Sequence, residues 1–247
     1  MPDKKTVLIT GAAGYVGAYL RGAFRDRYDL RLTDIVPADG EEITIANLGD
    51  MDAMLDITRD VDAVVHLAAH PGDRDFHTKL LPDNIAGTYN VFEACRQNEV
   101  PRIVYASTNH MSGMNERLYS PPLLCTPDMY RPDGWYGAMK GMAEIAGRYL
   151  SDEADLRFIS IRIGTFSGRD EPDEPRQCST LLTPRDCVQL FSRAVEYEGA
   201  EKFLVTFGTS GNAEGEHRSF LDISPAIEVL GYCPQDNIMK HRHRFAS

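Results

Sequence analysis

Residues 6–17 have the sequence TVLITGAAGYVG, and this stretch decides the fold. The uncharged run 6–10 is typical of a buried strand, and the apolar residues of 15–27 have helical spacing. Between them, Gly11, Gly14 and Gly17 form a G-x-x-G-x-x-G turn, one position different from G-x-G-x-x-G. Such a turn brings backbone N–H groups and a helix N-terminus to one point, which suits a nucleotide pyrophosphate. The stretch therefore predicts the first strand, turn and helix of a dinucleotide-binding fold.

The same alternation of strand and helix continues along the chain. Further strands are predicted at 30–34, 42–46, 63–68, 102–107, 157–163 and 202–207. Further helices are predicted at 84–98, 134–151, 183–198 and 225–230, with a loop at 169–176. This order predicts the α/β class: a Rossmann-type doubly wound parallel sheet with helices on both faces. Residues 1–163 are expected to bind the nucleotide and carry the catalytic residues. Residues 164–247 are expected to form a small C-terminal substrate cap, interleaved with the main fold as one structural unit.

Composition argues against several classes of protein. The formal net charge of −11 disfavours a nucleic-acid partner. No apolar run is long enough to span a bilayer, and the first residues lead directly into a strand pattern, so we expect neither a membrane partner nor a signal peptide. The five scattered cysteines lack a C-x-x-C pair, which is typical of reduced thiols in a cytoplasmic protein. The seven histidines form no H-E-x-x-H motif, so no metal is expected. The basic stretch 240–244 is interpreted as a solvated, frayed tail.

Asp34 lies at the end of the second predicted strand, where it can face the glycine turn. A carboxylate at this position accepts hydrogen bonds from the adenine ribose hydroxyls and repels a 2′-phosphate. Residues 35–38, IVPA, contain no arginine that could hold such a phosphate. NAD is therefore favoured over NADP as cofactor. The other interpretation of Asp34 is a cap of the turn at the strand end.

Tyr136 and Lys140 lie four residues apart on a predicted helix. This spacing is one helical turn, so both side chains can reach a single point. A lysine ammonium beside a phenol favours the phenolate and lowers its pKa towards working pH. The pair therefore predicts a general base, and its other interpretation is an ordinary amphipathic pair on a helix surface.

Four features together resemble the extended short-chain dehydrogenase/reductase family. They are the three glycines of the turn, Asp34, the Ser107–Thr108 pair at a strand end, and Tyr136-x-x-x-Lys140. Within that family, four longer strings are similar to the uronate dehydrogenases: STNH at 107–110, RPDGWYG at 131–137, RIG at 162–164 and LGYCPQDN at 230–237.

The resemblance implies NAD-dependent oxidation at C1 of a hexuronic acid, such as glucuronate or galacturonate, to a lactone. It implies that Tyr136 is the general base, that Lys140 holds the nicotinamide ribose and that Thr108, in place of the usual serine, binds the reacting oxygen. Implied cofactor contacts are Gly11, Gly14, Tyr15, Val16, Gly17, Asp34, Asn47, Leu48, Leu67, Ala68, Ala69, Asn84, Tyr136, Lys140 and Ile163. Implied substrate contacts are Thr108, Asn109, His110, Tyr136, Thr165, Arg176 and His70. A homo-oligomer is also implied.

Arg176 gives a reason for the substrate to be an acid, because a guanidinium matches a carboxylate bidentately. Its other interpretation is a solvated arginine in a charged loop, and His110 is equally compatible with a structural hydrogen bond behind the catalytic strand. Residues 68–71, AAHP, stand where the resembling enzymes carry glycines and a serine that touches substrate, so His70 brings a bulky group to the pocket edge. Asn47 stands where an aspartate usually faces the adenine, and its amide oxygen can still accept a hydrogen bond.

Three alternatives for the function remain at this point. A sugar with another anion at C6, such as the sulfonate of sulfoquinovose or the phosphate of glucose 6-phosphate, would also satisfy Arg176. A nucleotide-sugar epimerase would use the same tyrosine, lysine and NAD, although the short region after residue 163 leaves little surface for a nucleotide diphosphate. A non-catalytic NAD sensor would not need to keep the hydroxyl, tyrosine and lysine that are all present here.

Overall fold

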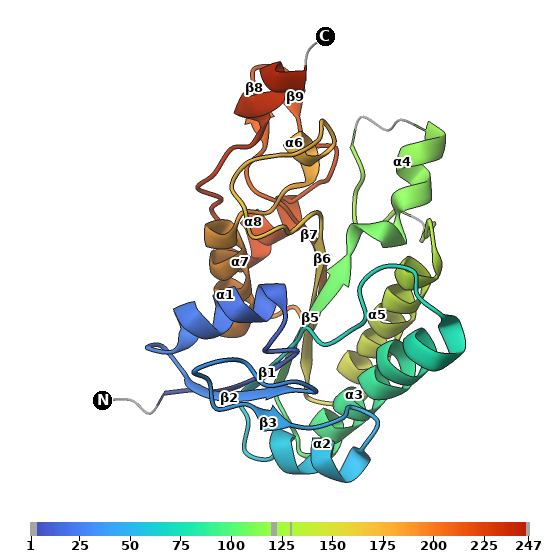
Figure 1. The fold of residues 1–247 in the computed structure, drawn as a ribbon, viewed down its shortest axis with the longest axis vertical. Helices are drawn as coiled ribbons and strands as arrows, with labels where there is room; N and C mark the ends of the chain where they lie inside the picture. Colours follow the sequence, from blue (N-terminus) through green and yellow to red (C-terminus); the bar gives the residue numbers. More distant parts are fainter. Residues whose placement is uncertain (1–3, 120–122, 129, 246–247) are drawn as a thin grey trace.

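The computed structural model describes residues 4–119, 123–128 and 130–245, and Figure 1 shows their arrangement. Its main sheet has the order β3-β2-β1-β4-β5-β6-β7, and every neighbouring pair is parallel. The strand order reverses direction between β1 and β4, which is the switch point where doubly wound folds bind their ligands. The predicted fold class is therefore confirmed. The strands are β1 Thr6–Thr10, β2 Asp29–Asp34, β3 Thr44–Ile45, β4 Ala63–His66, β5 Arg102–Thr108, β6 Arg157–Ile163 and β7 Phe203–Gly208.

Helices cover both faces of this sheet (Figure 1). On one face lie α1 Tyr15–Phe24, α7 Pro184–Glu196 and α8 Ser224–Leu230, and on the other lie α2 Met51–Thr58, α3 Thr88–Gln97 and α5 Trp135–Glu153. The shorter elements are the π-helix η1 Phe76–Gly87, the 3-10 turn η2 Asn109–Met111, α4 Gly113–Tyr119, α6 Gln177–Thr180, the hairpin strands β8 Ala213–Glu214 and β9 His217–Arg218, and the 3-10 helix η3 Met239–Phe245. In the described part of the chain, no helix is long and apolar enough to cross a membrane.

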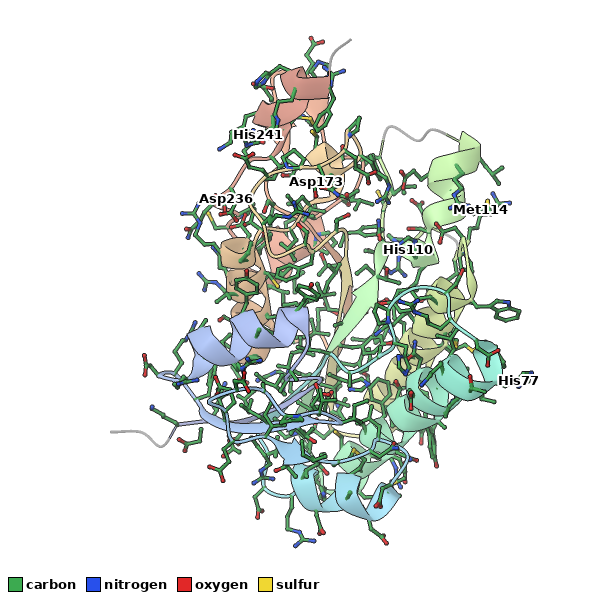
Figure 2. All side chains as sticks on the ribbon, viewed as in Figure 1. His77, His110, Met114, Asp173, Asp236 and His241 are labelled. Carbon is green, nitrogen blue, oxygen red and sulfur yellow. The ribbon has the colours of Figure 1, made fainter. Side chains whose placement is uncertain are left out.

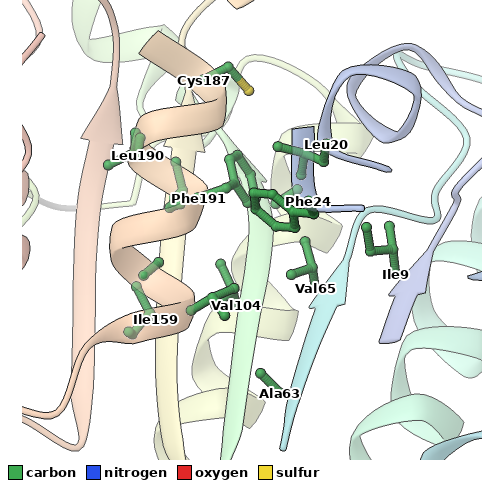
Figure 3. Packing of buried hydrophobic residues seen from close by; sticks show 14 of the residues in the cluster. Ile9, Leu20, Phe24, Ala63, Val65, Val104, Ile159, Cys187, Leu190 and Phe191 are labelled. Carbon is green, nitrogen blue, oxygen red and sulfur yellow. The ribbon is translucent and has the colours of Figure 1, made fainter. Parts of the chain in front are cut away.

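The sheet separates two apolar cores. Successive side chains of a strand point to opposite faces, so in β1 Val7 and Ile9 join one core and Leu8 joins the other. Figure 3 shows the first core, where Phe24 of α1 and Phe191 of α7 pack over the sheet. Strands covered on both faces have nearly continuous apolar sequences, and this explains why their positions could be predicted.

The elements that differ from the prediction are mostly short or locally irregular. The third strand contains two residues rather than five, and the helix expected at 84–98 begins at Thr88 after the π-helix η1, which contains Pro82. Elements α2, α4, α6 and the hairpin β8–β9 were not predicted. The prediction of a solvated, frayed tail at 240–244 is only partly correct: the residues are largely exposed, but they are not frayed. These residues belong to η3, where Met239 is buried and Arg244 pairs with Glu171 at 2.8 Å.

Candidate active site

A cleft opens at the carboxyl ends of β1, β2 and β4, the predicted position of a dinucleotide. It brings together nine of the predicted residues: Gly11, Gly14, Asp34, Asn47, Leu48, Leu67, Ala68, Ala69 and His70. Ala13, Thr33, Ile35, Val36, Ala46 and Asp83 complete its lining. The other predicted cofactor residues lie outside this lining. Tyr15 is 79% exposed at the start of α1, Val16 and Gly17 follow it, and Ile163 ends β6. Asn84 is buried and exchanges two hydrogen bonds with the backbone of His70, at 2.7 and 2.9 Å.

The glycine turn is closed so tightly that side chains would not fit. Gly11 has φ +72°, and a Cβ there would lie 2.7 Å from the backbone nitrogen of Ala68. A Cβ on Gly17 would lie 2.5 Å from the carbonyl oxygen of Gly11, so α1 packs directly on the turn. Asp34 accepts a hydrogen bond from the Ala13 N–H at 2.9 Å, and its other oxygen accepts one from the Ile35 N–H at 2.7 Å. Asp34 thus caps its own turn and also lines the cleft.

The structure brings Tyr136 and Lys140 together on the first turns of α5. The helix begins after Gly134, where the Tyr136 N–H donates to Asp73 at 2.8 Å. The Lys140 Nζ donates to the Ala106 carbonyl of β5 at 2.7 Å and lies 5.9 Å from the centroid of the Tyr136 ring. The lysine is 3% exposed. This anchor to β5 fixes the rotation of α5, so that Tyr136 lies beside the carboxyl end of the sheet.

The pKa values of this pair differ from the sequence-based expectation. Burial raises the pKa of Tyr136 to about 12, whereas a lowered value was expected. Burial also lowers the pKa of Lys140 to about 7, against an opposing effect of the Glu144 charge. The physical reason is that removal from water penalises both charged forms, and residue spacing alone does not reveal this cost. The expectation that Lys140 lowers the pKa of the Tyr136 phenol is therefore wrong for the protein without ligands.

A buried ion pair continues the same face of α5. Glu144, one turn after Lys140, is fully buried and accepts hydrogen bonds from Arg162 at 2.9 and 3.2 Å and from Ser160 at 2.7 Å. Arg162 of β6 is 2% exposed in its side chain and lies 5.2 Å from the ring centroid of Tyr130. This network was not predicted. The available signals were the four-residue spacing after Lys140 and the position of Arg162 in the string RIG.

A second, smaller pocket lies beside Tyr136. It is lined by Gly72, Asp73, His110, Arg117, Asp133, Gly134, Tyr136 and Gly137. Figure 2 shows His110 between the end of β5 and α4. The His110 Nδ1 lies 3.0 Å from an oxygen of Asp133, and its ring centroid lies 6.3 Å from that of Tyr136. His110 therefore faces this pocket while it is held by a carboxylate. Asp73, Asp133 and Arg117 were not predicted as site residues.

Thr108 and Asn109 are buried at the end of β5. They come directly before His110, which lines this pocket. The Thr108 hydroxyl accepts a hydrogen bond from the His110 N–H at 3.2 Å. The Asn109 side chain is buried, and among the described residues its Oδ1 has no hydrogen-bond partner. A buried amide oxygen without a partner is costly, and a bound hydroxyl would satisfy it.

Three other predicted substrate residues already have partners within the protein. The Thr165 hydroxyl lies 2.8 Å from that of Thr180, and the His70 Nε2 lies 2.6 Å from Asp83 in the cofactor cleft. Arg176, at the start of α6, forms a bidentate ion pair with Glu116 of α4, with Nε–Oε1 and Nη2–Oε2 distances of 2.7 and 2.9 Å. None of these three lines the pocket beside Tyr136.

Comparison with known proteins gives consistent matches. Residues 7–187 match the model of the NAD dependent epimerase/dehydratase family. An NAD-dependent glucose-6-phosphate dehydrogenase of Haloferax volcanii is 34% identical over 94% of this chain and 93% of its own. A uronate dehydrogenase of Pseudomonas syringae pv. tomato is 35% identical over 89% of this chain and 81% of its own. The crystal structure of a glucuronic acid dehydrogenase from Chromohalobacter salexigens, 32% identical, superimposes with a TM-score of 0.85 over 97% of this chain and 88% of its own.

Proposed function

Because the chain belongs to the NAD dependent epimerase/dehydratase family, within the extended short-chain dehydrogenases/reductases, we propose that it oxidises the C1 hydroxyl of an anionic hexopyranose. The preferred substrate class is a hexuronic acid such as glucuronate or galacturonate, and the product is the lactone. The chain is an NAD-dependent oxidoreductase that acts on a CH–OH group of a sugar. The observation that carries the proposed proton transfer is the position of Tyr136 and Lys140, on one helix, at the sheet edge that holds the cofactor cleft. The anionic class of the sugar is supported by relatives that act on uronate and on glucose 6-phosphate.

The shape and the lining residues of the cofactor cleft fit NAD. The turn at Gly11 has no room for a Cβ, and the first turn of α1 follows it directly, as a pyrophosphate site requires. Asp34 lies where the adenine ribose would bind, and Leu48 and Ala46 provide apolar surface beside it. NAD, when bound there, supplies the hydride acceptor. We assign residues 1–163 to this role, and 164–247 to the substrate side and the outer part of the sheet.

The residues around Tyr136 have separate roles in the proposed reaction. Tyr136 takes the proton of the C1 hydroxyl onto its phenolate oxygen. Lys140 in its ammonium form stabilises that phenolate, and the buried charge of Glu144 helps to keep the lysine protonated. Thr108 donates a hydrogen bond from its hydroxyl to the reacting oxygen, while the same hydroxyl accepts one from the His110 N–H. Asn109 and His110 bind sugar hydroxyls.

A panel of sugars tests the substrate class. We expect NADH formation with glucuronate or galacturonate, and a KM for glucose that is about 10²-fold higher, since a charge-assisted contact at Arg176 would be lost. A preference for glucose 6-phosphate or a 6-sulfonated hexose would indicate another anion at C6. The relative that is a glucose-6-phosphate dehydrogenase supports including glucose 6-phosphate. Activity on glucose with none on any anionic sugar would contradict the role of Arg176.

Cofactor preference should depend on Asp34. In Asp34→Asn the amide oxygen can keep the hydrogen bond from Ala13, while the charge that repels a 2′-phosphate is lost. We expect the ratio of the NADPH and NADH dissociation constants to fall about tenfold, as measured by fluorescence titration. Asp39→Asn, in the exposed loop that follows β2, removes the same charge and should leave the ratio unchanged. Equal ratios in all three proteins would exclude Asp34 from cofactor selection.

A further inference from the structure

We propose that Glu116 is a specificity-determining residue, whose carboxylate occupies Arg176 and competes with the acid group of the substrate. The inference rests on the proposed function, because it takes Arg176 as the group that receives the substrate anion. Helix α4, which carries Glu116, thereby helps to set the affinity for anionic sugars. Nothing in the sequence spacing indicates it, since the two residues are 60 positions apart.

Glu116 binds Arg176 in the same way that a substrate carboxylate would bind it. Glu116 engages two nitrogens of the guanidinium at 2.7 and 2.9 Å, which is the fork that a substrate carboxylate would use. The guanidinium carbon lies 5.8 Å from the ring centroid of Phe220, so one face of the group is covered by an aromatic side chain. An incoming acid must therefore displace Glu116 or bind less favourably at another edge.

The surrounding charges strengthen the competition. The charges of Glu116, Glu174 and Asp133 all act on Arg176. Asp133 also lines the pocket beside Tyr136, so this group of carboxylates extends from Arg176 to the proposed reaction site. With these carboxylates near it, the guanidinium of Arg176 binds a substrate anion less strongly than an unpaired arginine would. Removal of one of the three changes that balance in favour of an anionic substrate.

Displacement of Glu116 requires only a local change. The side chains of Glu116 and Arg176 are 26% and 32% exposed, and ion pairs with this access to water contribute little to stability. Glu116 lies on the short helix α4, which packs chiefly on η2, whereas Arg176 lies at the start of α6 (Figure 1). The pair joins two separately supported elements. A rotation of the Glu116 side chain therefore frees Arg176 without unfolding either element.

Glu116→Gln tests the proposal directly. We expect the KM for glucuronate to fall about tenfold relative to the unmodified protein, with kcat and the KM for glucose unchanged. In an Arg176→Met background the same substitution should have no effect on the KM for glucuronate, because the two residues act as one pair. Glu93→Gln is the matched control. Glu93 forms a bidentate pair with Arg96 on α3, at 2.8 and 2.6 Å, and its loss changes the net charge equally.

The results of these measurements distinguish a failure of the Glu116 proposal from a failure of the proposed substrate class. An unchanged KM for glucuronate in Glu116→Gln, or an equal fall with glucose, would overturn the competition, provided that thermal unfolding shows an intact fold. If the unmodified protein oxidises only neutral sugars, the proposed substrate class is wrong. In that case a gain of glucuronate oxidation in Glu116→Gln would still support the blocking role, and the absence of a gain would refute it.

Discussion

Replacement of Tyr136 by phenylalanine is expected to lower kcat about 10³- to 10⁴-fold while NAD binding stays nearly unchanged. The substitution removes the only phenol that lies on α5 beside both Lys140 and His110 among the described residues. The ring remains, so packing against η2 is preserved. Steady-state kinetics give kcat, and fluorescence titration with NADH gives the dissociation constant.

A control and a pH profile make this prediction specific. Tyr149→Phe changes a tyrosine on the same helix that is 61% exposed, and it should leave kcat unaltered. Because burial raises the pKa of Tyr136 to about 12, the phenolate fraction and the rate should both increase from neutral into alkaline pH. Because burial lowers the pKa of Lys140 to about 7, Lys140→Met should lower the rate most near and below neutral pH, where the ammonium is present. A flat profile, or turnover in Tyr136→Phe near the original rate, would remove Tyr136 from the role of base.

The second large effect is expected on stability. Glu144→Met leaves the Arg162 guanidinium buried without its counter-charge, and such a change costs about 3–5 kcal/mol of the free energy of unfolding. Urea denaturation of the protein without ligands measures this free energy. The loss would be large for a domain of ordinary stability.

A double variant distinguishes the ion pair from simple packing. Glu144→Met combined with Arg162→Met removes both charges, so it should be more stable than Glu144→Met alone. Glu93→Gln breaks an exposed pair and should cost less than about 1 kcal/mol. If the double variant were the least stable of the three, the unpaired charge would not explain the loss.

The sheet could be predicted from the sequence because parallel strands covered on both faces have continuous apolar runs. Residues 7–9 and 63–65 are examples, and the strands lie there. The π-helix η1 could not be predicted, since Pro82 argues against any regular helix at that position. The 3-10 helix η3 was missed because its basic residues resemble a solvated tail. Its order depends on tertiary contacts such as Arg244–Glu171.

In the candidate site, too, some features could be predicted from the sequence and others could not. Gly11, Gly14 and Asp34 follow strand ends, and parallel strands bring their carboxyl ends to one edge, so their convergence could be predicted. The raised pKa of Tyr136 could not, because burial depends on what packs against it. The Arg176–Glu116 pair joins α4 to the start of α6, two segments far apart in the sequence, and spacing rules do not extend to such contacts.

The contacts that anchor α5 influence which substitutions such a protein can accept during evolution. Lys140 is tied to β5 and Glu144 to β6, so the proposed chemistry depends on the rigid centre of the sheet. Arg176 and Glu116, in contrast, lie on short peripheral elements. Substitutions in α4 and α6 can therefore alter which sugar is accepted while the proton-transfer apparatus is inherited intact. Laboratory selection for a new sugar should accumulate its first changes in those two helices.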